Sequence, residues 1–411
     1  MIKKIANILV GVLLFLHTYL SLSIWVKLSP PASVIFTMPK ILVPNIINFM
    51  VFFDALVIVG MMIFFYWSKK KLTIFPKIAL IFFIAFFISG CLYLIIISRV
   101  SLGITESDYS IDSVDENVSY VYYDYTEDGK RMDANITSIE FYLPEENSKN
   151  TCFIYFPYGN YKIHEDMAMH ERLRTTLLSE GYGVAYITGR TRLNGDITDI
   201  VKDLKSGTAL LKQLSAQFGY RDFIVSGGSA GGHLAQLVAY TDQIPLYTNE
   251  SLNIDSTVDG VISFYGISDL SYDLEYFTRP DKMSLLDKIG DFTYKKSSGG
   301  LSLEESNQEM TYGVLGGPPD GENILYQMSD TKNLLNTHSP KTLLIHGSHD
   351  SMTPIEADYL LYNKMKTLGC DVTFLELPFV DHAFDSLVNE HSFVVDKVFK
   401  ETMKWMLVNF E

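Results

Sequence analysis

Cysteine is scarce in this chain, which excludes a disulfide-rich fold and a zinc site built from cysteines. The 411 residues include only three cysteines, Cys91, Cys152 and Cys370. Cys91 lies in an apolar run, which leaves one possible disulfide elsewhere, and no zinc-site spacing is present. Cys152 and Cys370 each border an expected core strand, so we predict two buried thiols. Nothing in the sequence calls for a metal or another cofactor.

Internal repeats and basic patches with interleaved aromatic residues are also missing, which argues against a solenoid and against a nucleic-acid partner. The net charge is −15, but it is unevenly distributed. Residues 1–100 carry nine Lys and Arg residues and a single acid, Asp54, whereas the rest of the chain is strongly acidic. The composition therefore indicates a basic, apolar front and an acidic, water-soluble rear.

Three apolar runs fill the front region, at residues 5–26, 45–67 and 78–98. Each has the roughly 20 residues that a transmembrane helix needs. We predict three transmembrane helices, with the lipid bilayer as their partner. The first run alone resembles a signal peptide, but no cleavage motif follows it and two more runs come after it. Asp54 is expected to be a helix-contact residue near a polar surface.

The basic residues set the expected orientation of these helices. With the N-terminus inside, six lysines lie on the inner side (Lys3, Lys4, Lys69, Lys70, Lys71 and Lys77), and Lys27, Lys40 and Arg99 lie outside. The positive-inside bias then predicts a cytoplasmic N-terminus and an extracytoplasmic region after Arg99.

Strand-like and helix-like segments alternate through residues 119–411, after a linker at residues 101–118. This pattern predicts an α/β fold, with a mostly parallel sheet covered by helices on both faces. The alternation fails between Asp269 and Ser339, where charges and glycine pairs dominate. We interpret residues 269–339 as a polar, cap-like insertion.

The stretch Val225–Ala235 reads VSGGSAGGHLA and places Ser229 between glycines at −2 and +2. It lies where a β-type run passes into a helical one. A nucleophile on such a turn adopts a strained backbone, so its neighbours two residues away must be small. Ser229 is therefore predicted to be a catalytic nucleophile.

A serine nucleophile needs a base and an acid that orients the base. Two later strands end in the loops LIHGSHDSMTP and LPFVDHAF, which supply Asp350 and His382. Ser, Asp and His thus follow successive strands, at the edge where open α/β sheets place their sites. Other candidates have structural interpretations: His233 as a packing residue, and His346 and His349 as parts of the acid loop. Asp381 is excluded as the acid because adjacent side chains point apart.

On these motifs, residues from about 115 to the end resemble α/β-hydrolases of the acetyl-esterase and lipase group, near the hormone-sensitive-lipase and bacterial carboxylesterase branches. The resemblance implies an oxyanion hole after the third strand, formed by a His-Gly-Gly-Gly-like turn. Here that turn reads Phe156-Pro-Tyr-Gly-Asn-Tyr161, and only Gly159 matches. Gly159, Asn160 and Ala230 are the expected donors. Tyr158 is expected to crowd the oxyanion side.

The predicted function is a membrane-anchored carboxylesterase for short, acetyl-like acyl groups on a small-molecule or glycan ester. Two alternatives stay open: a serine exopeptidase of the prolyl-oligopeptidase class, and a non-catalytic membrane protein that binds through this fold. The sequence leaves the oligomeric state open.

Overall fold

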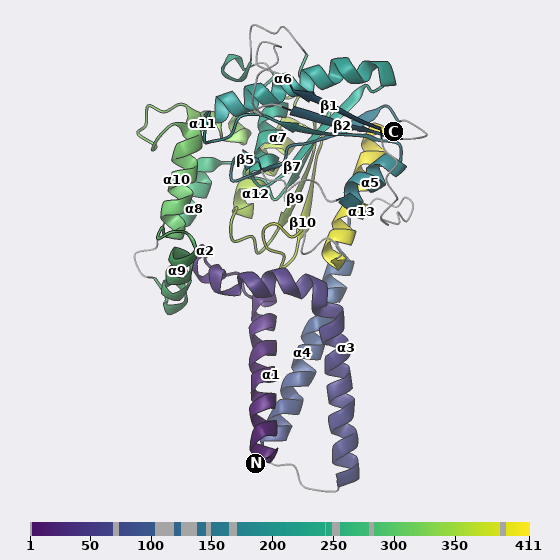
Figure 1. Cartoon of the computed structure of the whole chain (residues 1–411), viewed down its shortest axis with the longest axis vertical. Coiled ribbons are helices and arrows are strands. Elements are labelled where there is room, and N and C mark those ends of the chain that lie inside the picture. The colour runs from purple at the N-terminus through teal and green to yellow at the C-terminus, as the bar shows by residue number, and fades with distance from the viewer. Residues whose placement is uncertain are drawn as a thin grey trace.

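The computed structural model describes residues 2–68, 74–102, 119–124, 138–144, 149–163, 171–242, 244–248, 255–278, 283–386 and 392–411. Most of the expected linker, residues 103–118, and the lysine cluster at 69–71 lie outside these ranges. In Figure 1, a helical stalk from the front of the chain carries a larger α/β domain.

An eight-stranded sheet forms the centre of that domain, in the order β1-β2-β6-β3-β7-β8-β9-β10. The strands are β1 (Ser119–Asp124), β2 (Ser138–Leu143), β3 (Thr151–Tyr155), β6 (Gly183–Thr188), β7 (Asp222–Gly228), β8 (Gly260–Phe264), β9 (Lys341–Gly347) and β10 (Val372–Leu377). β2 pairs antiparallel with β1 and with β6, and the other pairs are parallel. The fully buried residues of β3 and β8 suit strands covered on both faces. The predicted α/β class is confirmed.

Helices cover both faces of the sheet. One face packs against α6 (Ile197–Ser215), α7 (Ala230–Tyr240) and α12 (Ile355–Leu368), and the other against α5 (Glu171–Ser179) and α13 (Phe393–Phe410). A capping box between Asp196 and Asp199 starts α6, satisfying amides that the helix cannot bond itself. Cys152 and Cys370 are buried and unpaired, as expected.

The region between β8 and β9 is more helical than its sequence suggested. It contains α8 (Leu270–Phe277), α9 (Leu285–Ser297), α10 (Leu303–Leu315) and the short α11 (Leu325–Met328). Ser284 and Ser302 start α9 and α10 through capping boxes. The insertion is less uniformly polar than expected, because Leu285, Leu286, Ile289 and Phe292 of α9 are exposed. These four residues, at spacings that share one side of a helix, form what we call the apolar face of α9.

The front of the chain forms α1 (Ile2–Trp25), α2 (Pro30–Ser33), α3 (Thr37–Ser68) and α4 (Ile74–Ser98). Within the part of the chain that the structure describes, two helices have the length and composition of membrane spans, at Ile46–Ile63 and Pro76–Ser98, where we expected three. The apolar part of α1 in the described residues, Val10–Trp25, is shorter. Pro44 lies inside α3, which begins crosswise to the stalk in Figure 1.

Asp54 contacts a helix as expected, but it lies inside the helical stalk instead of near a polar surface. Its carboxylate is 1% exposed and lies 3.0 Å from Nε2 of His17 on α1. Pairing is the usual way for an apolar helix bundle to hold a carboxylate. Asp54 therefore links α3 to α1.

The front helices pack directly against the α/β domain, below the carboxyl ends of β9 and β10 in Figure 1. Lys27 forms an ion pair with Glu356 of α12 at 2.9 Å, and Ser29 donates a hydrogen bond to Asp287 of α9. The rings of Trp25 and Phe379 lie 4.6 Å apart. A single apolar cluster spans both parts, joining Tyr93 and Ile97 of α4 to residues of the sheet. This packing brings the stalk next to the candidate site.

Candidate active site

Ser229 occupies a strained turn between β7 and α7. Its φ is +55°, a left-handed value that costs a non-glycine residue energy and persists only where the surroundings enforce it. A Cβ on Gly227 would lie 2.4 Å from the carbonyl carbon of Gly231, and a Cβ on Gly231 would lie 2.4 Å from the oxygen of Phe156. Both glycines are therefore required by backbone contacts across the bend.

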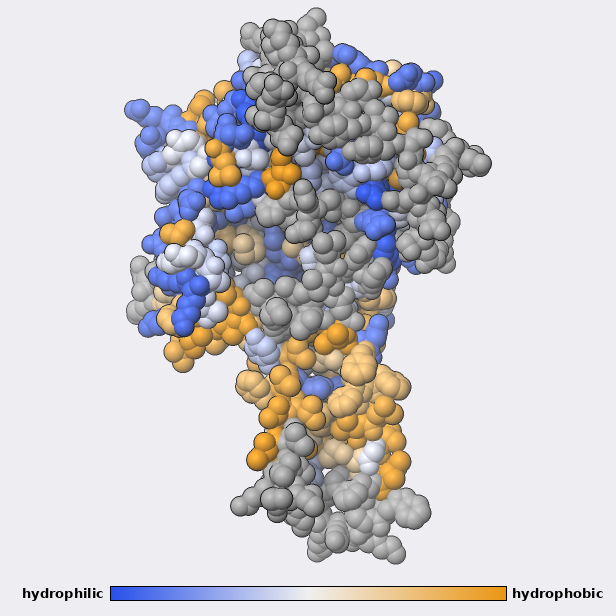
Figure 2. All heavy atoms as spheres, viewed as in Figure 1, coloured by the Kyte–Doolittle hydropathy of each residue, from blue (hydrophilic) through white to orange (hydrophobic). Residues whose placement is uncertain are grey.

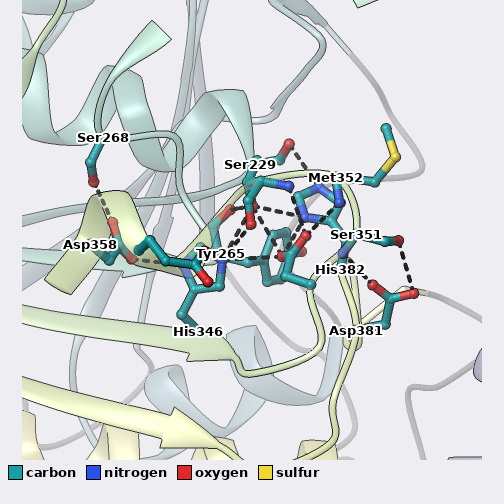
Figure 3. Close-up of polar contacts among 12 residues, drawn as sticks. Ser229, Tyr265, Ser268, His346, Ser351, Met352, Asp358, Asp381 and His382 are labelled. Atoms are coloured by element: carbon teal, nitrogen blue, oxygen red, sulfur yellow. Dashed lines mark hydrogen bonds and ion pairs between the residues drawn. The ribbon is translucent and has the colours of Figure 1, made fainter. Parts of the chain in front are cut away.

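The side chains of Ser229, His382 and Asp350 meet in one line of hydrogen bonds. Ser229 and His382 are labelled in Figure 3. Oγ of Ser229 lies 3.0 Å from Nε2 of His382, and Nδ1 of His382 lies 2.8 Å from Oδ2 of Asp350. Asp350 follows β9 and His382 follows β10, so the carboxyl edge of the sheet brings together residues far apart in the sequence. The distances are those of a nucleophile with its base and orienting acid.

Asp350 is held as a buried carboxylate. Its Oδ1 accepts hydrogen bonds from the backbone amides of Met352 at 2.8 Å and Thr353 at 2.7 Å. Burial alone would raise its pKa, but His382 and His346 hold the pKa well below the usual aspartate range. Asp350 is thus ionised wherever the protein is folded near neutral pH.

His346 extends this network on the far side of Asp350. It is fully buried, with Nε2 3.2 Å from Oδ2 of Asp350 and Nδ1 2.7 Å from Oδ2 of Asp358. The other carboxylate oxygen of Asp358, Oδ1, accepts a hydrogen bond from the hydroxyl of Ser268. Burial lowers its pKa, but the two carboxylates outweigh this and raise the pKa of His346 to about 10. His346 is therefore an imidazolium between two acids. The sequence indicated a structural residue, but no local signal predicted its charge or its contact with Asp358.

The other candidate groups lie outside the triad. Asp381 accepts hydrogen bonds from the amide and hydroxyl of Ser351, so Asp350 is the acid that contacts His382. His233 is buried between the hydroxyl of Tyr161 at 2.6 Å and the carbonyl of Ser329 at 2.8 Å, and burial lowers its pKa to about 4. His349 contacts Ser348 and the ring of Phe379. The packing interpretation of His233 agrees with these contacts.

Tyr265, which the sequence analysis missed, supports the base. Its ring contacts that of His382 edge-on, with centroids 4.8 Å apart, and its hydroxyl donates to the Asp385 carboxylate. Tyr265 follows β8 with a φ of +40°, a second strained residue at this edge. A positive φ in a tyrosine is visible only in the structure.

The expected oxyanion turn is a small hairpin of β4 (Tyr158–Gly159) and β5 (Lys162–Ile163). Asn160 and Tyr161 connect the strands with φ values of +54° and +56°. This is the left-handed conformation, which asparagine tolerates better than most residues. Gly159 and Asn160 line the same pocket as Ser229, and Ala230 begins α7, whose first amides have no acceptor within the helix.

The expectation for Tyr158 is wrong. Its side chain is 1% exposed and turns into the core, where its hydroxyl donates to the carbonyl of Arg190 at 3.1 Å and accepts from the amide of Gly189 at 2.5 Å. Successive residues of a strand point to opposite sides, so Tyr158 leaves the site while Gly159 faces it. Tyr158 does not crowd the oxyanion side.

A pocket of about 260 Å³, which we call the cap-side pocket, opens over Ser229 and His382. The insertion supplies much of its wall through α8, α9 and α10 (Asp273, Phe277, Tyr294, Leu303, Ser306, Asn307 and Met310). Asp273 and Asn307 are buried, and Nδ2 of Asn307 donates to Oδ2 of Asp273 at 2.9 Å. Oδ1 of each has no hydrogen-bond donor among the described residues. Burial raises the pKa of Asp273 to about 7.

The mostly parallel sheet, the strained serine and the acid and histidine loops at its carboxyl edge define an α/β-hydrolase fold with a Ser-His-Asp constellation. A model of the BD-FAE family matches residues 139–365, more than half of the chain. The chain therefore belongs to the BD-FAE family.

Two curated relatives of this chain are named as ester hydrolases. A probable carboxylic ester hydrolase, LipM of Mycobacterium tuberculosis, is 25% identical over 277 residues, which cover 65% of this chain and 58% of LipM. Esterase LipC of the same organism is 28% identical over 191 residues, covering 46% of this chain and 41% of LipC. The matched regions thus span only about two to three fifths of these relatives.

Two solved structures share the fold. Esterase 2 of Thermogutta terrifontis, phosphonylated by sarin, has a TM-score of 0.53 at 18% identity, covering 71% of this chain and 95% of that one. An acetyl ester-xyloside bifunctional hydrolase from Caldicellulosiruptor lactoaceticus has a TM-score of 0.51 at 19% identity, covering 67% of this chain and 89% of that one.

Proposed function

We propose that this chain is a membrane-anchored carboxylesterase that removes short acyl groups from hydroxyl-bearing substrates. The observation that carries the proposal is the Ser229–His382–Asp350 geometry beneath the cap-side pocket. The family assignment and the esterase names of the relatives support ester chemistry in particular.

The geometry supports a two-step mechanism. His382 takes the hydroxyl proton of Ser229 at Nε2 while Oγ bonds to the ester carbonyl carbon. The resulting oxyanion is stabilised by amides of Gly159, Asn160 and Ala230. The intermediate collapses as the alcohol leaves with the proton from His382. A water molecule, deprotonated by His382, then attacks the acyl-enzyme and releases the acid and Ser229.

Two features support the substrate class. A volume of about 260 Å³ lies below the usual range of roughly 300–1,000 Å³ for small-molecule pockets, which favours a short acyl group. The two unpaired oxygens of Asp273 and Asn307 need donors, and leaving them buried without any is costly. Hydroxyl groups of a sugar or polyol ester would supply those donors.

Labelling by a fluorophosphonate tests the nucleophile. We expect wild-type protein to be labelled and Ser229→Ala to stay unlabelled, with ester turnover reduced about 1,000-fold or more. Ser251→Ala serves as the serine control and should retain labelling. Equal labelling of wild type and Ser229→Ala would refute the assignment.

A panel of nitrophenyl esters tests the acyl specificity. Acetate and butyrate should be cleaved with a higher kcat/KM than the decanoate, and a prolyl dipeptide amide should stay intact. Faster cleavage of the amide would instead indicate the exopeptidase alternative.

A further inference from the structure

A second cavity meets the candidate active site from the side of the membrane helices. Its volume is about 550 Å³, within the range of ligand-binding pockets. Front-region residues form one wall (Ser23, Ile24, Ser33, Val34, Val43, Pro44 and Tyr93). The loop after β10 forms the opposite wall, including Phe379 and Phe384. We call it the membrane-side cavity.

The membrane-side cavity and the cap-side pocket share four lining residues: Tyr294, Leu303, Met352 and His382. The histidine that contacts Ser229 thus lies between a small space under the cap, which holds the buried Asp273 and Asn307, and a larger space beside the stalk. An ester bound at Ser229 would have one part in each space. This position makes the larger cavity part of the same site.

The lining of the membrane-side cavity suits a hydrocarbon chain. Its front-region wall includes Ile24, Val34, Val43 and Pro44, and the opposite wall adds aliphatic and aromatic side chains. Ser23 and Ser33 have hydroxyls that already bond to backbone carbonyls of their own helices, at 2.6 and 2.7 Å. These two hydroxyls are therefore not needed as partners for a polar ligand.

The cavity lies where the front helices meet the α/β domain, since its lining includes Ser33 of α2 and Tyr294 and Ser297 of α9. The stalk below it is covered with apolar side chains in Figure 2, and apolar residues also gather at the lower end of α9. The apolar face of α9 includes Leu285 at 74% and Phe292 at 60% exposed. Exposed apolar side chains beside a membrane-type stalk fit a helix that rests on the lipid surface.

We infer that the substrate is an ester-bearing amphiphile that stays in the bilayer, with its apolar chain in the membrane-side cavity and its ester at Ser229. The inference rests on the proposed esterase function and adds the kind of molecule that bears the ester. A chain that enters beside α1 and α3 needs no transfer through water, which is unfavourable for each CH₂ group that it exposes. The unpaired oxygens of Asp273 and Asn307 in the cap-side pocket then face the polar end of the substrate.

Hexadecyl acetate in phosphatidylcholine vesicles and nitrophenyl acetate in solution test the inference, with the full-length chain reconstituted in both assays. Val34→Trp and Val43→Trp fill the membrane-side cavity, and Ile81→Trp, at a residue 65% exposed on α4, is the matched control. For each cavity variant we expect the ratio of kcat/KM for hexadecyl acetate to that for nitrophenyl acetate to fall at least tenfold. The control should keep the wild-type ratio.

Each other outcome decides against a particular claim. An unchanged ratio in both cavity variants would overturn the amphiphile as substrate. So would a wild type that cleaves nitrophenyl acetate but not hexadecyl acetate. Neither result would contradict the proposed esterase function. A wild type that cleaves neither ester would overturn the esterase and the inference together. Fluorophosphonate labelling of each variant checks that Ser229 and His382 remain assembled.

Discussion

At the residue scale, the feature that most distinguishes this site is a fully buried histidine, His346, beside the acid. His346 gives Asp350 a positive neighbour on the side away from His382. Its other nitrogen contacts a second carboxylate, that of Asp358 (Figure 3). Two carboxylates and one imidazolium are thereby buried with mutual partners, which removes most of the cost of burying them. We regard His346 as a positioning residue for Asp350.

The charge of His346 makes the stability of the protein depend on pH. Its pKa is raised from 6.5 to about 10, so its contribution is complete below pH 6.5 and is lost as the pH rises towards 10. We expect His346→Gln to lower the free energy of unfolding by about 3–5 kcal/mol at pH 6 and by progressively less up to pH 10. Thermal unfolding of both proteins at several pH values measures this. A difference that is constant with pH would contradict the charge, and His338→Gln, at an exposed histidine, is the control.

Asp273 also makes the stability of the folded protein depend on pH. Its folded pKa of about 7 exceeds the unfolded value of 3.8, so the folded state holds its proton more tightly. Wild-type stability should therefore fall between about pH 4 and pH 7 relative to Asp273→Asn, with a constant difference above pH 7. Thermal midpoints of the two proteins between pH 4 and pH 8 test this, with the exposed Asp371→Asn as control. Parallel profiles for wild type and Asp273→Asn would show that Asp273 is ionised normally.

At the scale of elements, the turn between β7 and α7 depends on glycine for a reason of packing. Gly231 lies in the first turn of α7, where alanine is ordinarily the better helix former. Its missing side chain instead leaves room for the oxygen of Phe156, whose amide is bonded to Ser226 at 2.8 Å. The turn before β4 and the serine elbow are thus packed against each other.

We expect Gly231→Ala to destabilise the protein by about 1–3 kcal/mol and to cut ester turnover, because the new methyl group must displace backbone next to Ser229. Gly313→Ala in α10 is the matched control, since its Cβ would meet no atom closer than 3.5 Å. That control should gain up to about 1 kcal/mol from helix propensity. Thermal unfolding and nitrophenyl acetate turnover give both readouts. Full activity in Gly231→Ala would show that the turn relaxes without cost.

At the scale of the whole molecule, the stalk and the α/β domain share one apolar cluster, so the orientation of the stalk determines which side of a membrane the site faces. The excess of lysine at the N-terminus and between α3 and α4 predicts that this end lies in the cytoplasm. The site would then face outward.

Protease added to intact spheroplasts tests this topology. We expect it to degrade the region after Arg99, with a tag at the N-terminus protected until the cells are lysed. A tag that is cut in intact spheroplasts, together with a protected α/β domain, would reverse the orientation. A cytoplasmic marker protein that stays intact is the control for leakage.

The sequence by itself determined the α/β class, the three residues that meet as a triad and the glycine elbow. These depend on local patterns: strand and helix periodicity, a turn that only glycine permits, and loops that parallel strands bring to one edge. Each such pattern lies within a short segment of the chain, so it can be recognised from the sequence alone.

Only the tertiary structure decided the rest, because it depends on contacts between distant segments. The inward side chain of Tyr158, the pairing of His346 with Asp358, and the ion pair of Asp54 with His17 all follow from packing that no local pattern specifies. The same holds for the membrane-side cavity, whose walls come from residues 23–44 and 379–386. A cavity is the space left between packed elements, and chain order does not encode that space.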